Sequence, residues 1–158
     1  MRSISVFGAT GSIGESTFDL LMRQGGASAY RTVALTGGRN IARLAEQARA
    51  LNAEIAITAF DDCLPALRDA LAGSGVKAAA GAGALLEAAD RPADWVMSGI
   101  VGAAGIAPGF RALANGGTLA LANKESLVAG GALLMSTAAR HGARILPVDS
   151  EHSAVFQS

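Results

Sequence analysis

The chain has 158 residues, of which 51% are hydrophobic and 16% are charged, and its 13 basic residues balance its 13 acidic residues. This apolar content supports a hydrophobic core and argues against a disordered chain, and the zero net charge argues against nucleic-acid binding. A single cysteine, Cys63, excludes a disulfide framework and a cysteine-based zinc site. Because no apolar run reaches the roughly 20 residues that span a bilayer and the N-terminus carries no signal-peptide pattern, we expect a soluble cytoplasmic protein without a membrane partner.

Short apolar segments alternate with amphipathic segments along the whole chain. The strands predicted from this pattern cover residues 3–7, 31–36, 54–58, 76–80, 94–98, 118–122 and 143–148. The predicted helices cover residues 12–24, 41–51, 61–72, 83–89, 108–115 and 126–141. Each connection between strands is too long for a hairpin and long enough for a helix. The pattern therefore predicts an α/β fold, a doubly wound parallel sheet of about seven strands that is Rossmann-like.

Three glycines, Gly8, Gly11 and Gly14, follow the first predicted strand in the sequence GATGSIG and open the first predicted helix. We expect Ser12 to cap this helix, and Met22 to lie on its inner face. Glycines at such a turn let the backbone approach a pyrophosphate, and the helix N-terminus supplies N–H groups with a partial positive charge. The alternative is a purely structural turn, and a P-loop is excluded because no Gly-Lys-Ser/Thr follows. The expected donors to a dinucleotide are Thr10, Gly11, Ser12 and Ile13.

The end of the second predicted strand reads Thr-Gly-Gly-Arg-Asn and contains no acidic residue. An NAD site usually places Asp or Glu there for the ribose 2′-hydroxyl, whereas an arginine can bind a 2′-phosphate. Gly38, Arg39 and Asn40 therefore favour NADPH as the cofactor. The alternative is that Arg39 is a solvated loop residue.

A polar cluster, Asn123-Lys124-Glu125-Ser126, directly follows the predicted strand 118–122. Asn123 or Ser126 could cap the next helix, and Glu125 suits its positive end. Lys124 does not suit that position, because a cation at a helix N-terminus is unfavourable. A ligand that carries an anionic group or a carbonyl would explain the lysine.

A second polar cluster, Asp149-Ser150-Glu151-His152, follows the last predicted strand. In extended backbone Asp149 and Glu151 would point to the same side, where two carboxylates repel each other unless a cation lies between them. Mg²⁺ and Mn²⁺ take such oxygen ligands. The alternatives are a solvated strand end and, less favoured because His152 is the only nearby nitrogen ligand, a zinc site.

Together and in this order, GATGSIG, GGRN, SGIVGAAG, LANKESLV and PVDSEHSAVFQ resemble the N-terminal part of the 1-deoxy-D-xylulose 5-phosphate reductoisomerase family. The resemblance implies an NADPH-dependent oxidoreductase that also needs a divalent metal, Mg²⁺ or Mn²⁺. It implies conversion of a phosphosugar, 1-deoxy-D-xylulose 5-phosphate, to 2-C-methyl-D-erythritol 4-phosphate in the non-mevalonate route to isoprenoids. It also implies a homodimer for the complete protein.

The resemblance further implies roles for the two polar clusters. Asn123 and Glu125 would line the cofactor site, Lys124 would reach the substrate, Asp149 and Glu151 would bind the metal, and Ser150 and Glu151 would contact the substrate. Lys124 and Glu151 would be the catalytic residues. We expect an NADPH-binding domain at residues 1–148 and the truncated start of a catalytic domain at 149–158, inactive alone because the third metal-binding carboxylate and the phosphate-binding residues are absent.

Two other functions remain compatible with the glycine turn. One is a different NADP-dependent dehydrogenase, such as a semialdehyde dehydrogenase, although Cys63 comes too early in the sequence to be its nucleophile. The other is a non-enzymatic nucleotide-binding module, in which Asp149 and Glu151 would have no role.

Overall fold

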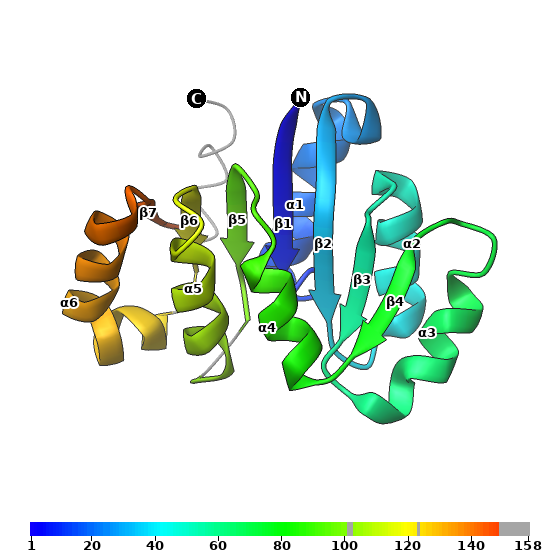
Figure 1. The fold of residues 1–158 in the computed structure, drawn as a ribbon. Coiled ribbons are helices and arrows are strands. Elements are labelled where there is room, and N and C mark those ends of the chain that lie inside the picture. The colour runs from blue at the N-terminus through cyan, green and yellow to red at the C-terminus, as the bar shows by residue number, and fades with distance from the viewer. Residues whose placement is uncertain (101–102, 123, 149–158) are drawn as a thin grey trace.

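The computed structural model describes residues 1–100, 103–122 and 124–148, and of residues 103 and 124–129 it describes the backbone alone. Within these residues the chain forms one parallel sheet of order β4-β3-β2-β1-β5-β6-β7 (Figure 1). The strands are β1 (Arg2–Phe7), β2 (Tyr30–Gly37), β3 (Ile55–Thr58), β4 (Lys77–Ala80), β5 (Trp95–Ser98), β6 (Thr118–Leu121) and β7 (Arg144–Pro147). All carboxyl ends of the strands therefore lie along one edge of the sheet.

Helices connect successive strands throughout the described part of the chain. The α-helices are α1 (Ser12–Arg23), α2 (Ile41–Leu51), α3 (Leu64–Ala70), α4 (Ala82–Asp90), α5 (Ile106–Leu113) and α6 (Lys124–His141). Three short 3₁₀ turns are η1 (Gly26–Ser28), η2 (Asp61–Cys63) and η3 (Ala103–Gly105). None of the described helices is long and apolar enough to cross a membrane.

The strand order reverses at β1, because β2 lies on one side of it and β5 on the other. Crossovers between parallel strands are right-handed, so a reversal of direction sends the later helices to the opposite face of the sheet. Figure 1 shows α4 and α5 in front of the sheet and α1 and α2 behind it. The result is a three-layer sandwich with a reversal point beside β1, where ligands of such sheets bind.

Each face of the sheet has its own hydrophobic core. Ile4 and Val6 of β1 pack with Leu21 of α1 and Leu44 of α2 in one core. Phe7, the next residue of β1, packs in the other core, which α4, α5 and α6 cover. This alternation follows from the two-residue repeat of a strand and explains why both neighbouring residues of β1 are apolar.

The structure confirms the predicted fold class, and all predicted strands and helices are present at their predicted places, with ends that differ by a few residues. The predicted helix 61–72 is shorter, because η2 precedes α3 and the chain leaves helical geometry after Ala70. Pro65 lies in the first turn of α3, where its missing N–H costs little. The last helix begins at Lys124, so Ser126 lies within its first turn and does not cap it.

Two predictions about α1 are wrong. Gly11, not Ser12, is the N-cap, and no side chain caps the helix. Ser12 is the first helical residue, because the helix begins directly after the last residue of the glycine turn, Gly11. Met22 is 43% exposed, because it lies about 100° around the helix from the buried Leu21.

Candidate functional site

The turn between β1 and α1 is bound to the end of β2. The Gly8 amide donates a hydrogen bond to Thr36 Oγ1 at 3.0 Å, and the Ala9 amide donates to the Thr36 carbonyl at 2.7 Å. The Gly99 amide, after β5, donates to the Phe7 carbonyl at 2.8 Å. The turn is therefore fixed from both neighbouring strands.

The three positions of the turn differ in whether, and why, they require glycine. Gly8 has φ +78°, and a Cβ there would lie 2.9 Å from the Gly99 carbonyl carbon. A Cβ on Gly14 would lie 2.2 Å from the Gly8 carbonyl oxygen, so only glycine allows α1 to approach the turn this closely. A Cβ on Gly11 would have its nearest neighbour at 3.5 Å, an ordinary contact. Gly8 and Gly14 shape the turn, and Gly11 leaves the helix N-terminus open to a ligand.

A groove of about 360 Å³ lies across the carboxyl ends of the central strands. It is mostly apolar in lining, and its size falls in the usual range for small-molecule sites. Its floor is the glycine turn, and its walls come from the loops after β2, β3 and β5. The lining residues are Gly8, Thr10, Gly11, Thr36, Gly37, Gly38, Ala59, Phe60, Leu85, Gly99, Ile100 and Ala104.

The structure places three predicted cofactor residues, Thr10, Gly11 and Gly38, in the lining of this groove. Ser12 and Ile13 follow in the first turn of α1, where helical N–H groups have no acceptor within the helix. The groove thus combines free backbone donors with the positive end of a helix, which is the arrangement that binds a phosphate anion.

Arg39 lies at the rim of the groove, beside one of its walls. Its guanidinium lies 4.0 Å from the centre of the Phe60 ring, and its Nη1 lies 2.9 Å from the Asp62 carboxylate. The guanidinium lowers the pKa of Asp62 through this hydrogen bond. Both side chains are exposed, and exposed ion pairs are weak. A phosphate dianion could therefore compete with Asp62 for the guanidinium.

Asn40 has a structural role that the sequence interpretation did not include. Its Oδ1 accepts a hydrogen bond from the Arg43 amide at 3.3 Å, so Asn40 caps α2. Arg43 in turn forms a two-point ion pair with Glu15 of α1, at 2.6 and 2.8 Å, and these hydrogen bonds lower the pKa of Glu15. The loop after β2 is thus joined to α1 through α2.

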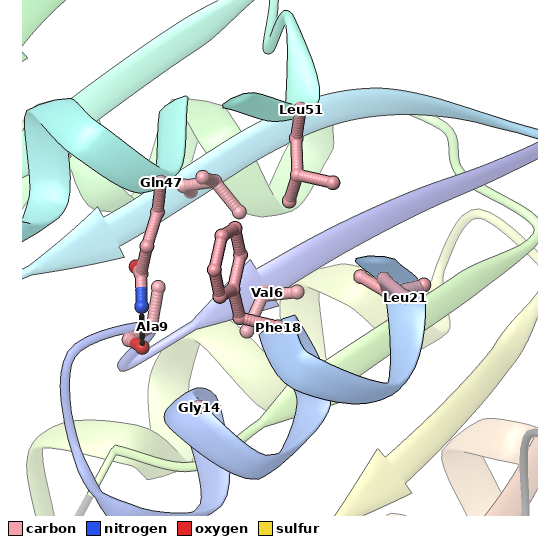
Figure 2. Close-up of a pocket in the computed structure, with 8 residues that line it drawn as sticks. Val6, Ala9, Gly14, Phe18, Leu21, Gln47 and Leu51 are labelled. Atoms are coloured by element: carbon pink, nitrogen blue, oxygen red, sulfur yellow. Dashed lines mark hydrogen bonds between the residues drawn. The ribbon is translucent and has the colours of Figure 1, made fainter. Parts of the chain in front are cut away.

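Two residues that support this site were not predicted from the sequence. Phe60, which supports Arg39, follows β3 and carries no motif. Gln47 of α2 is fully buried, and its Nε2 donates a hydrogen bond to the Ala9 carbonyl at 3.0 Å (Figure 2). A signal for Gln47 was present, because it is a polar residue on the apolar face shared by Leu44 and Leu51.

The two predicted polar clusters are described only in part. Lys124 and Glu125 are the first residues of α6, where the backbone alone is described, and Asn123 lies outside the described residues. Residues 149–158, with the predicted metal ligands Asp149 and Glu151 and the predicted substrate residue Ser150, also lie outside them. In the described part of the chain, no three His, Cys, Asp or Glu residues gather as a metal site.

The described chain nevertheless leads to both clusters from one edge of the sheet. The Ala122 amide donates to the Ser98 carbonyl at 3.0 Å, and the Val148 amide donates to the Leu121 carbonyl at 2.9 Å. Ser98 precedes Gly99, which lines the groove. The chain segments that precede the two clusters therefore end at the edge that carries the groove.

A glycine turn that opens a helix beside the reversal point of a doubly wound sheet defines a dinucleotide-binding domain of the Rossmann class. Residues 4–131 match the family model of 1-deoxy-D-xylulose 5-phosphate reductoisomerase, and the chain belongs to this family. The reductoisomerase of Cereibacter sphaeroides is 75% identical over all 158 residues, which cover 40% of that protein's length. The chain thus spans about two fifths of the curated relatives that it matches.

Solved structures agree with this family assignment. The reductoisomerase from Zymomonas mobilis in complex with NADPH is 50% identical, with a TM-score of 0.91 over 99% of this chain and 41% of that one. A reductoisomerase in complex with NADPH, fosmidomycin and magnesium is 39% identical, with a TM-score of 0.87 over 99% of this chain and 38% of that one. The prediction of the family is confirmed, and the alternative of a semialdehyde dehydrogenase is not supported.

Proposed function

We propose that this chain is the NADPH-binding part of a reductoisomerase that converts 1-deoxy-D-xylulose 5-phosphate to 2-C-methyl-D-erythritol 4-phosphate. The observation that carries the proposal is the groove at the reversal point, built on the glycine turn. Its support from relatives is the Zymomonas mobilis structure, which holds NADPH and shares this fold at 50% identity.

The pyrophosphate of NADPH would lie at the N-terminus of α1. The amides of Thr10, Ser12 and Ile13 would donate to it, and the helix dipole favours its charge. The Gly11 amide donates to the Gly8 carbonyl at 3.2 Å, so Gly11 would contribute a close approach of its backbone to the phosphate. Gly11 and Ser12 are exposed, so a ligand can approach the backbone at this point of the turn.

The 2′-phosphate would lie at the loop Gly38-Arg39-Asn40 at the other end of the groove. The Phe60 ring holds the Arg39 guanidinium there, and a guanidinium offers several donors to one phosphate. The loop carries no carboxylate, so a 2′-phosphate would meet no repulsion from residues 37–40. This arrangement favours NADPH over NADH.

The rest of the chemistry belongs to the two polar clusters. Asn123 and Glu125 would line the nicotinamide end of the cofactor site, and Lys124 would bind and orient the substrate. Asp149 and Glu151 would hold a divalent ion, since their carboxylates are the hard oxygen ligands that Mg²⁺ and Mn²⁺ take, and Ser150 and Glu151 would contact the substrate. Such an ion, when bound, polarises a carbonyl oxygen of the substrate. A cytoplasmic homodimer is part of the same proposal.

The test of cofactor binding is thermal unfolding of the purified chain with NADPH, with NADH and without ligand. A ligand at a hundred times its dissociation constant adds about 2.7 kcal/mol of stability. We expect a rise of several degrees in Tm with NADPH and a much smaller rise with NADH at equal concentration. Equal rises would refute the role of Arg39, and no rise with either ligand would refute the proposal for this chain.

The test of the activity uses the complete reductoisomerase, because the chain spans only about two fifths of its relatives. We expect oxidation of NADPH that depends on both 1-deoxy-D-xylulose 5-phosphate and a divalent metal. A complete protein that binds NADPH but oxidises none with this substrate would refute the assigned reaction and leave the nucleotide-binding module.

A further inference from the structure

Gln47 is a buried amide on an otherwise apolar face of α2. Its neighbours on this face, Leu44, Ala48 and Leu51, are buried, and Gln47 itself has 0% exposure. Figure 2 shows its side chain beside the Phe18 ring of α1, above a gap that is too small for a water molecule. A leucine would fill this position without the cost of burying an amide.

The Gln47 amide makes one hydrogen bond with the glycine turn and leaves its oxygen unused. Its Nε2 donates to the Ala9 carbonyl at 3.0 Å, across 38 residues of sequence. Its Oε1 is buried and meets no donor among the described residues. Because an unused buried acceptor is unfavourable, the gain that this glutamine offers and a leucine cannot lies in its Nε2 contacts: the hydrogen bond to Ala9, and a weaker interaction with the Glu15 carboxylate that helps to lower the pKa of Glu15.

The contact with Ala9 determines the direction of the next amide. The described chain contains no cis peptide bond, so the Ala9 carbonyl and the Thr10 N–H belong to one trans plane and point in opposite directions. Ala9 is 2% exposed and its carbonyl is turned to α2, whereas Thr10 lines the groove. Holding the Ala9 carbonyl therefore turns the Thr10 N–H away from α2.

We propose that Gln47 is a positioning residue for the cofactor, which acts by holding the Thr10 amide in the direction that donates to the pyrophosphate. This inference rests on the proposed binding of NADPH. The Ala9 amide is held separately by Thr36, so without Gln47 the Ala9 carbonyl loses this hydrogen bond while the start of the turn stays in place.

The experiment compares two ligands on the purified protein by titration calorimetry. NADPH carries the pyrophosphate, whereas adenosine 2′-phosphate contacts only the end of the groove near Arg39. For Gln47→Leu we expect about tenfold weaker binding of NADPH, the loss of roughly one hydrogen bond, and unchanged binding of adenosine 2′-phosphate. Gln47→Met, which keeps the length of the side chain, gives the same comparison if the leucine variant does not fold.

The matched control is Leu51→Ala, on the same helix and the same buried gap, without a hydrogen bond to the turn. It should lower Tm and leave both affinities unchanged. The proposal is overturned if Gln47→Leu leaves NADPH binding unchanged, or if it weakens both ligands equally. If the unmodified protein binds adenosine 2′-phosphate but not NADPH, the proposed pyrophosphate site itself fails.

Discussion

Replacing Gly14 with alanine should destabilise the fold, and replacing Gly11 with alanine should not. A Cβ at position 14 would lie 2.2 Å from the Gly8 carbonyl oxygen and 2.4 Å from the Ala9 carbonyl carbon. Both neighbours are backbone atoms, so α1 must move by roughly 1 Å to restore an ordinary contact. Overpacking of this kind costs about 1–3 kcal/mol, and the backbone contact places Gly14→Ala in the upper part of that range.

The assay for Gly14→Ala is thermal unfolding followed by circular dichroism. About 2–3 kcal/mol corresponds to a fall in Tm of roughly 4–12 °C for a chain of this size. Gly11 is the matched control, because its φ of −80° and ψ of 178° suit any residue and its Cβ would make only an ordinary contact. We expect Gly11→Ala to change stability by less than about 1 kcal/mol.

Gly14→Ala should have the larger effect on stability, whereas Gly11→Ala should have the larger effect on NADPH binding measured per folded molecule. The methyl group of Gly11→Ala would stand where the pyrophosphate approaches the backbone, so we expect binding to weaken on the order of tenfold. A Tm for Gly14→Ala within 2 °C of the unmodified protein, or an equal loss for Gly11→Ala, would refute the division of roles among the glycines.

Other predictions concern charge. Arg39→Gln should weaken NADPH on the order of tenfold and leave NADH unchanged in parallel titrations, and an equal loss for both would exclude contact with the 2′-phosphate. The amide and the hydroxyl of Ser3 donate hydrogen bonds to the Asp94 carboxylate and lower its pKa. The ionised carboxylate therefore stabilises the fold at pH values above its unfolded pKa of about 3.9, and this stabilisation is lost as the pH falls through the lower pKa of the folded state. Asp94→Asn should therefore show a shallower loss of Tm on acidification, and an unchanged acid profile would contradict this. In the complete enzyme, Asp149→Asn should raise the Mg²⁺ concentration needed for half-maximal activity, whereas NADPH affinity stays the same; an unchanged Mg²⁺ requirement would argue against Asp149 as a ligand.

The sequence was sufficient for the fold because its signals are local. Each strand is a short apolar run, and each helix repeats its apolar residues at helical spacing. The glycine turn lies between the first strand and the first helix. The prediction for Arg39 also rests on local sequence, since this residue lies two positions after the second strand. Local signals do not fix the ends of the elements, as at Ser12, because Gly11 takes the capping position without offering a side chain.

The missed residues depend on contacts between segments that are distant in sequence. Gln47 reaches Ala9 across 38 residues, and Phe60 contacts Arg39 from the loop after another strand. No spacing rule predicts such pairs, because they arise only when the sheet brings the loops together. The sequence therefore predicts three residues that line the groove, Thr10, Gly11 and Gly38, and does not predict Gln47 and Phe60, which support the turn and Arg39.

The pairing of β1 with β5 has a consequence for synthesis on the ribosome. β1 is made before β5, and its Ser3 is hydrogen-bonded to Asp94, 91 residues later in the chain. Synthesis proceeds at about 5–20 residues per second, so the 91 residues between these partners take roughly 5–18 s to make. During this time the edge of β1 that pairs with β5 is unpaired, although β2 can already pair with the other edge. An open strand edge pairs readily with other chains, so aggregation of the nascent protein should depend on how fast residues 30–98 are translated.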